Sequence, residues 1–112
     1  MTTPEPQDVG VLLSTCPPGE ADGLAAFLVE RRLAACVNVL GGVRSVYRWQ
    51  ENIERDDEAL LVIKCRTENI PELIETLAKK HPYDVPEILA VDVRDGYPPY
   101  LAWVLENTVP SK

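Results

Sequence analysis

Apolar positions follow a period of two in some stretches of the chain and a helical period in others, which predicts a mixed α/β subunit. Residues 9–14 form a short apolar run rich in branched side chains, and the segment Cys16-Pro17-Pro18-Gly19 bounds it, as is typical of a buried strand. A helix is expected from Pro18 or Gly19 through Arg32. Its apolar face follows the helical period: Ala21, Leu24, Ala25 and Leu28.

The middle of the chain predicts a long pair of strands. Residues 34–49 are rich in valine and favour a strand, and Gly41-Gly42 within them indicates a bulge or bend. The polar segment 50–58 is expected as the end of the hairpin, and the apolar run 59–66 as the second strand. Beyond the two glycines, alternation places one set of side chains on a common face: Val43, Ser45, Tyr47 and Trp49.

A second helix is expected to begin at Asn69 and to end at Pro82. Glu72, three residues after Asn69, completes a predicted capping box, and Pro71 fits the first turn. The remaining chain divides into a linker, a strand, a turn and a short helix at residues 83–86, 87–93, 96–99 and 100–107. The flanking segments 1–8 and 109–112 are expected to be a flexible N-terminus and a C-terminal tail.

The element order β-α-β-β-α-β with a terminal helix predicts an α+β, ferredoxin-like domain over residues 9–108. Its antiparallel sheet would carry both crossover helices on one face, and the short C-terminal helix is too small to cover the other face. Tyr47 and Trp49, near the tip of a long hairpin, are therefore predicted to lie at an interface between subunits.

Composition narrows the class of protein further. The 112 residues are 46% hydrophobic, enough for one core, and 11 basic against 18 acidic residues give a formal charge of −7. That balance argues against nucleic acid and anionic membranes as partners. The longest apolar run, residues 24–29, is far shorter than the roughly 20 residues that span a bilayer. Residues 1–8 lack the features of a secretory signal. Three cysteines without a C-x-x-C pair indicate free thiols and a cytoplasmic location.

Motifs that carry catalytic chemistry are missing from the sequence. His81 is the single histidine, and no nucleophile elbow, dinucleotide-binding or phosphate-binding loop occurs. We therefore expect a protein that is not an enzyme.

Three segments carry a resemblance to a known family: RLAACVNVLGGVRSVYRW at residues 32–49, HPYDVPEILAV at 81–91 and PYLAW at 99–103. They are similar to the CutA family of divalent-cation-tolerance proteins. The resemblance implies a ferredoxin-like homotrimer, with an architecture similar to that of PII-type signalling proteins, and a role in tolerance to copper and other divalent metals. It also implies that no catalytic activity is established for such a protein.

A metal site is the first chemical hypothesis. His81, Asp84 and Glu87 lie within seven residues, and imidazole and carboxylate ligands suit Cu(II) or Zn(II) if the linker turns to bring them together. Cys36 would add a soft ligand for Cu(I), and the family resemblance points to Cys36 and His81 as ligands. Copper or another divalent cation is the expected cofactor, and none is expected to be essential. In the alternative interpretation Cys36 is a buried thiol, His81 caps the second helix, and the carboxylates are solvated or ion-paired.

An anion site is the second hypothesis. Four cationic residues on the two central strands could line a pocket between subunits for a small anionic effector, as in PII-like proteins: Arg44, Arg48, Lys64 and Arg66. The alternative is cross-strand pairing with acidic residues. A purely structural trimeric adaptor is the third possibility.

Overall fold

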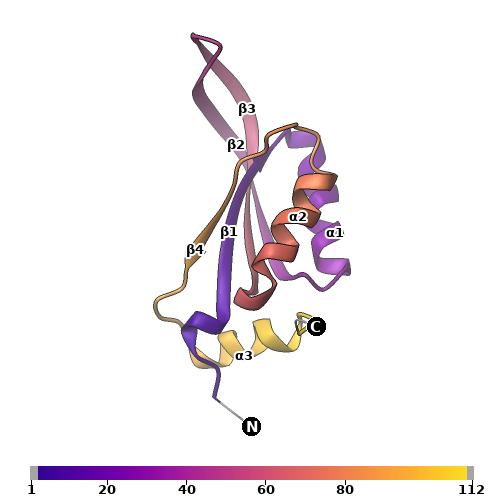
Figure 1. The fold of residues 1–112 in the computed structure, drawn as a ribbon, viewed down its shortest axis with the longest axis vertical. Helices are drawn as coiled ribbons and strands as arrows, with labels where there is room; N and C mark the ends of the chain where they lie inside the picture. The colour runs from indigo at the N-terminus through magenta and orange to yellow at the C-terminus, as the bar shows by residue number, and fades with distance from the viewer. Residues whose placement is uncertain (1–2, 111–112) are drawn as a thin grey trace.

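Four antiparallel strands form one sheet in the order β2-β3-β1-β4 (Figure 1). The computed structural model describes residues 3–110. The strands are β1 (Val9–Cys16), β2 (Ala34–Trp49), β3 (Asn52–Arg66) and β4 (Ile88–Asp92). The helices are α1 (Ala21–Glu30), α2 (Ile70–Lys80) and α3 (Pro98–Glu106), with short 3-10 helices η1 (Pro6–Asp8), η2 (Pro18–Glu20) and η3 (Thr67–Asn69). This arrangement confirms the predicted α+β class.

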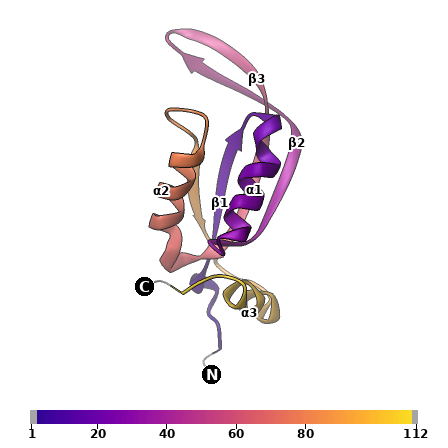
Figure 2. The same ribbon diagram turned by 90° about the vertical axis from the view of Figure 1, so that its right-hand side faces the viewer.

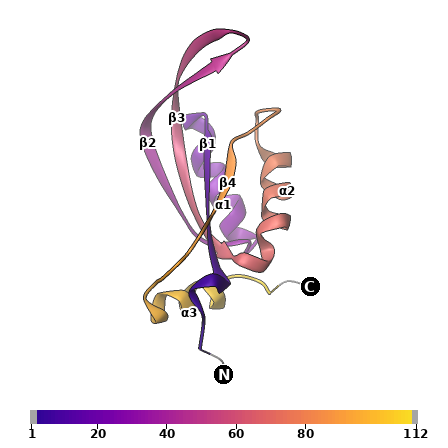
Figure 3. The same cartoon turned by 60° about the vertical axis from the view of Figure 1, so that its left-hand side comes forward.

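Helices α1 and α2 cover the same face of the sheet, as predicted (Figure 2). Alternate residues of β1 and β3 point toward these helices, so one face of each strand is buried with the apolar stripes of α1 and α2. The centre of this core contains fully buried side chains from strands and helices: Leu12, Leu61, Ile63, Leu28, Leu73 and Leu77. A second, smaller cluster forms where α3 lies across the end of the sheet at which β1 begins (Figure 3), and it contains Val9, Ala35, Leu101 and Val104.

The opposite face of the sheet is apolar and, apart from the end where α3 packs against Val9, no helix within residues 3–110 covers it. We call it the open face. The strand register places its side chains in rows across the strands: Val11, Leu13, Leu60, Val62, Leu89 and Val91. Leu89 is 57% exposed and Val91 is 46% exposed, so large apolar side chains face solvent in the single subunit. A contiguous exposed apolar surface of this kind marks an interaction site.

The β2–β3 hairpin extends well beyond the helices (Figure 1), and the molecule measures 53 × 25 × 22 Å. A register shift between Leu40 and Val43 confirms the bulge predicted at Gly41-Gly42. Gly42 has φ +73°, a conformation that glycine adopts without steric cost. The bulge lies where the hairpin leaves the body of the subunit.

The predicted polar end of the hairpin, residues 50–58, is wrong. β3 already begins at Asn52, and the turn consists of Gln50 and Glu51, which have φ of 48° and 70°. Pairing continues from Val43 opposite Glu58 to Trp49 opposite Asn52. The error arose because a two-stranded ribbon pairs through its backbone and tolerates polar side chains on both faces.

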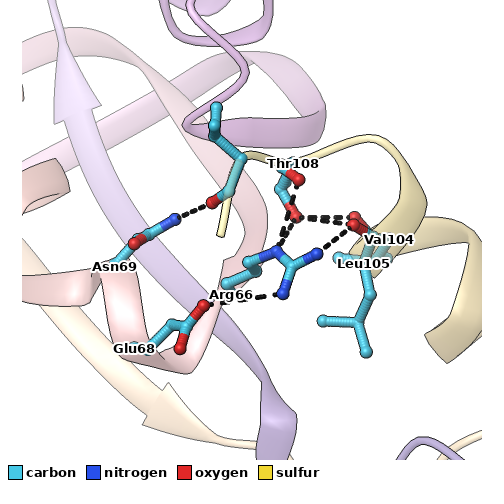
Figure 4. A network of polar contacts seen from close by, with 7 residues as sticks. Arg66, Glu68, Asn69, Val104, Leu105 and Thr108 are labelled. Carbon is cyan, nitrogen blue, oxygen red and sulfur yellow. Dashed lines mark hydrogen bonds and ion pairs between the residues drawn. The ribbon is translucent and has the colours of Figure 1, made fainter. Parts of the chain in front are cut away.

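The predicted capping box at Asn69 is also wrong. Asn69 is the N-cap of α2, but its side chain makes no bond to the helix. Its Nδ2 instead donates to the Val109 carbonyl at 2.5 Å, while its buried Oδ1 has no hydrogen-bond partner among the described residues. Asn69 thus fastens the segment that follows α3 onto the start of α2 (Figure 4).

Several boundaries differ from the predictions by a few residues. The predicted start of the first helix, residues 18–20, is the 3-10 helix η2, and Pro98 and Pro99 belong to α3 because proline fits a first helical turn. At the N-terminus, expected without regular structure, η1 forms and the Thr67 hydroxyl donates to the Gln7 carbonyl at 2.6 Å. Val109, in the predicted tail, donates its N–H to the Arg32 carbonyl at 3.0 Å. Residues 1–2 and 111–112 of these two predicted segments lie outside the described residues.

Candidate functional site

His81 connects two elements through both of its ring nitrogens. It is the C-cap of α2 and is buried. Its Nε2 lies 2.8 Å from the Thr15 carbonyl, and the Tyr83 backbone N–H lies 3.1 Å from its Nδ1. Because a carbonyl only accepts and an N–H only donates, Nε2 carries the proton and Nδ1 is the acceptor. The lone pair that a metal ion would need is therefore engaged by Tyr83.

Cys36 lies at a different place in the fold. It is half-buried on the open face, opposite Lys64 in the β2–β3 register, and its Sγ is 3.9 Å from the Lys64 ammonium. Tyr100 of α3 is close enough to Cys36 for the thiolate charge to contribute to its raised pKa, although burial contributes more. Cys36 thus lies near α3, whereas His81 contacts the opposite end of β1.

Within residues 3–110, no three or more His, Cys, Asp and Glu side chains are grouped so that they could hold a metal ion. The predicted set of Cys36, His81, Asp84 and Glu87 is therefore not assembled within one subunit. Asp84 and Glu87 do lie together, on the loop between α2 and β4, but His81 faces the protein interior.

Asp84 and Glu87 line a pocket of about 650 Å³ between that loop and the distal part of the β2–β3 hairpin. We call it the hairpin pocket. Its lining combines carboxylates, hydroxyls and aromatic rings, and contains no lysine, arginine or histidine: Thr15, Ser45, Val46, Tyr47, Trp49, Asp56, Glu58, Tyr83, Asp84, Val85 and Glu87. Two of its walls thus come from segments that are far apart in the sequence.

Glu58 is the buried carboxylate of the hairpin pocket. It is only 6% exposed, and its Oε2 accepts a hydrogen bond from the Tyr83 hydroxyl at 3.1 Å. Burial, this hydrogen bond and the charge of Glu58 raise the pKa of Tyr83 to about 12. In the same pocket the Tyr47 hydroxyl donates to Asp56, and this bond is the main reason that the pKa of Tyr47 is raised to about 12. The pocket is therefore electronegative.

The sequence did not reveal the role of Glu58. It was expected within the polar end of the hairpin, residues 50–58, yet it lies inside β3 and contacts Tyr83 across 25 residues of sequence. No local pattern reports such a contact. The one available signal is its position directly before the apolar run that begins at Ala59.

The four predicted anion-binding cations do not meet within a subunit. Arg44 and Arg48 lie on the distal hairpin, and Arg44 forms an exposed 3.7 Å ion pair with Asp57 on the neighbouring strand. Lys64 and Arg66 lie near α3 at the other end of β3. The ion pair of Arg44 with Asp57 is the cross-strand pairing that was the alternative to an anion site. An exposed ion pair of this type contributes little to stability.

Arg66 is engaged with the end of α3 (Figure 4). Its Nη2 donates to the Leu105 carbonyl at 2.6 Å, and its Nε lies 3.0 Å from the Thr108 hydroxyl and 3.3 Å from the Thr108 carbonyl. Nη1 is 3.5 Å from Glu68. The guanidinium thus satisfies carbonyls that a helix end leaves unpaired, and its donors face the C-terminal end of α3.

An antiparallel sheet with two helices on one face and an apolar open face defines a small ferredoxin-like subunit. Residues 10–107 match the CutA1 divalent ion tolerance protein family, and the chain belongs to this family. It is 48% identical over 99 residues to the divalent-cation tolerance protein CutA of Thermus thermophilus, covering 88% of this chain and 96% of that protein. It is 42% identical over 104 residues to the mouse protein CutA, covering 92% of this chain but 59% of the longer mouse protein.

Solved structures agree with this assignment. CutA1 from Oryza sativa superimposes with a TM-score of 0.92 at 38% identity, covering 98% of this chain and 100% of that one. The Thermus thermophilus divalent cation tolerance protein superimposes with a TM-score of 0.86 at 46% identity, covering 90% and 99%. Among residues 3–110, no helix is both long and apolar enough to cross a membrane.

Proposed function

We propose that the protein is a homotrimeric metal-tolerance protein whose subunits associate through the open face and the β2–β3 hairpin. The observation that carries the proposal is the open face itself, where Leu89 is more than half exposed beside Val91. Burying such a surface against other copies removes apolar area from water at about 25 cal/mol per Å². Trimers are what the CutA resemblance implies, and Tyr47 and Trp49 would contribute the hairpin part of the interface.

Copper or another divalent cation is the proposed ligand. Cys36 offers a soft sulfur on the open face. Among residues 3–110 of one subunit, it is not part of a group of three side chains that could hold a metal ion. A metal ion would therefore be coordinated by residues from more than one subunit, which makes metal affinity dependent on assembly. Binding of this type would be weak and exchangeable, suited to metal sensing or buffering rather than to catalysis.

A reducing compartment, the cytoplasm, is the proposed location. All three cysteines are free, two of them buried and Cys36 half-buried. Free thiols of this kind persist in reducing surroundings, and Cys36 has to stay reduced to bind Cu(I).

The state of assembly tests the first part of the proposal. Light scattering coupled to size exclusion should give three times the 12.5 kDa subunit mass. Leu89→Glu, which places a charge on the open face, should yield monomers. Val29→Glu is the matched control, because Val29 lies on α1, on the other side of the sheet, and is 41% exposed. A monomeric parent protein, or equal masses for the two variants, would contradict the proposal.

Copper titration under reducing conditions tests the second part. Cys36→Ser should lower Cu(I) affinity at least about tenfold, because a hydroxyl is a poor ligand for a soft ion. Cys65→Ser removes a thiol that is fully buried and should leave Cu(I) affinity unchanged. If Cys36→Ser binds Cu(I) like the parent protein, Cys36 is a packing residue and the metal is held elsewhere.

A further inference from the structure

Two Asp-Gly pairs occur in the chain, and the fold places them in different backbone settings. Asp22-Gly23 lies in the first turn of α1, and Asp95-Gly96 lies in the loop between β4 and α3. Both aspartates are exposed. Because glycine has no Cβ, its backbone nitrogen can approach the preceding side chain without a steric clash. The sequence therefore gives both pairs the same chemistry, and the fold has to distinguish them.

In the β4–α3 loop the backbone nitrogen of Gly96 lies against the carboxyl group of Asp95. The Gly96 N–H donates to Asp95 Oδ1 at 2.9 Å. The segment has neither helical nor strand structure, and the loop lies at the end of the molecule opposite to the hairpin (Figure 1). Two groups that are already in contact react as parts of one molecule, without the entropic cost of meeting.

The other pair is held apart by α1. A helical residue has fixed backbone angles, and Asp22 would have to leave them before its carboxyl group could form a ring with the Gly23 nitrogen. The residues on either side of the pair, Ala21 and Leu24, are 2% and 3% exposed and belong to the core. Unwinding this turn would bring both apolar side chains into water, so the reactive conformation of Asp22 requires a local opening of the fold.

Packing of α3 explains why glycine stands at position 96. A Cβ built on Gly96 would lie 3.0 Å from Cδ2 of Leu101, closer than an ordinary packing contact. Leu101 is 3% exposed and holds α3 in the second core cluster. The contact that anchors α3 therefore favours the residue that leaves the Asp95 carboxyl group open to attack.

We propose that Asp95 is a site of spontaneous isomerisation to isoaspartate, and that Asp22 is protected as long as α1 is folded. The contact between the Gly96 nitrogen and the Asp95 carboxyl group carries the proposal, and the helical setting of the second pair provides its internal comparison. The reaction takes place within one loop of one subunit, so it needs neither a metal ion nor a residue of another subunit.

The reaction has two steps. The Gly96 nitrogen bonds to Cγ of the protonated Asp95 carboxyl group and loses its proton, while the Cγ–O bond breaks and water leaves, which closes a five-membered succinimide ring. Water then adds to one of the two ring carbonyls and breaks the bond of that carbonyl to nitrogen. Opening at the main-chain carbonyl leaves the chain running through Cγ, as isoaspartate, whereas opening at Cγ restores aspartate. No atom is oxidised or reduced, and the isomer has one more main-chain carbon just before α3.

Peptide mapping of the assembled protein after prolonged incubation at physiological temperature tests this proposal. Electron-transfer fragmentation in the mass spectrometer distinguishes isoaspartate from aspartate at each position. Isoaspartate at position 95 should accumulate at least about tenfold faster than at position 22, which reacts only when α1 opens locally. In concentrated urea the two positions should react at comparable rates, because the helix no longer protects Asp22.

Two variants provide a matched comparison. Asp95→Glu should reduce the total isoaspartate, measured by enzymatic methylation, to the level found at position 22, because the longer side chain would have to close a less favourable six-membered ring. Asp22→Glu makes the same change in the helical pair and should leave the total unchanged. Both side chains are exposed, so neither variant should disturb folding.

Three results would overturn the proposal. The first is an assembled protein in which position 95 stays free of isoaspartate. The second is equal accumulation at positions 95 and 22 in the folded protein. The third is a difference between the two positions that persists in urea, which would assign the selectivity to neighbouring residues in the sequence and not to the fold. None of these results bears on assembly through the open face or on Cu(I) binding by Cys36.

Discussion

The imidazole of His81 joins the end of α2 to the end of β1. Its Nε2–H donates to the Thr15 carbonyl, and its Nδ1 accepts from the Tyr83 N–H. These two bonds fix where the chain leaves α2, and hence the position of the loop that forms one wall of the hairpin pocket. Both ring nitrogens of His81, which was predicted to be a metal ligand, thus have hydrogen-bond partners inside the subunit.

His81→Ala should lower the free energy of unfolding by about 2–3 kcal/mol in the presence of a chelator, since two buried backbone groups lose their partners. His81→Gln keeps a donor for the Thr15 carbonyl and should recover about half of that loss. Urea denaturation at one fixed protein concentration measures both variants. If His81→Ala is as stable as the parent protein without metal, the ring is held for a ligand instead.

Cys65 links stability to pH. It is fully buried, and this burial is the main reason that the pKa of its thiol is raised to about 11. The unfolded chain loses the thiol proton near pH 9, before the folded protein does. The unfolded state therefore binds fewer protons between pH 9 and 11, and stability must fall as pH rises through this window.

We expect the contribution of Cys65 to be complete below pH 9 and to decline by about 2–3 kcal/mol by pH 11. Cys65→Ser does not titrate there and keeps a donor near Gly10, so its stability should depend less steeply on pH than that of the parent protein. Denaturation midpoints measured from pH 8 to 11 give the slope. Identical slopes for the two proteins would show that Cys65 does not carry the effect.

At the scale of elements, the turn of the β2–β3 hairpin contains two residues that are poorly suited to it. Gln50 and Glu51 both have positive φ, which costs energy for residues other than glycine, asparagine and aspartate. Gln50→Asn with Glu51→Gly gives the Asn-Gly pair that a type I′ turn favours. The double variant should be more stable by about 0.5–1 kcal/mol.

Amide hydrogen exchange at Trp49 and Asn52, together with denaturation, measures this gain. Glu51→Ala is the control, because alanine carries the same Cβ penalty at positive φ and should bring no gain. An Asn-Gly variant with the same exchange rates as Glu51→Ala would indicate that the tip is already held by other contacts.

Elements were predictable from sequence where a side-chain pattern reports burial. The helical spacing of Leu24 and Leu28 and the apolar run before Arg66 both gave the correct element. The hairpin end was not predictable, because its backbone pairs without a buried face. The capping box was not predictable either, because the Asn69 side chain donates to the Val109 carbonyl, 40 residues away, and not to its own helix.

The candidate site was less predictable than the fold. Asp84 and Glu87 were identified as chemically relevant, and they do line a pocket, but Cys36 and His81 lie elsewhere. Glu58, the most buried acid of the pocket, could not be recognised without knowing that the α2–β4 loop folds back beside the hairpin. Asp84 and Glu87 share one loop, but their sequence neighbour His81 faces the interior, and the contact of Glu58 with the distant Tyr83 was not predicted.

At the scale of the whole molecule, two exposed tryptophans allow the contributions of the hairpin and of α3 to assembly to be compared. Trp49 is 58% exposed on the hairpin, and Trp103 is 41% exposed on α3, where it stacks on Tyr100. Trp49→Ala should weaken assembly by about 2 kcal/mol or more, as expected for an interface tryptophan, and Trp103→Ala should weaken it less.

Sedimentation velocity over a dilution series measures both variants. The parent protein and Trp103→Ala should remain assembled at concentrations at which Trp49→Ala dissociates. Equal dissociation of the two variants would remove the special role of Trp49 in the interface.

The strand order has a consequence for the sequence of events in synthesis. β1 is made first, yet its neighbours are β3 and β4, so that Val9 pairs with Arg66 and Gly10 with Asp92. Strands β2 and β3 are joined by a two-residue turn and can pair as soon as both are made, whereas β1 has no partner until β3 has left the ribosome. The nascent chain therefore carries β1 as an unpaired apolar strand until β3 has been made, and we expect chaperones that bind extended apolar segments to engage it there.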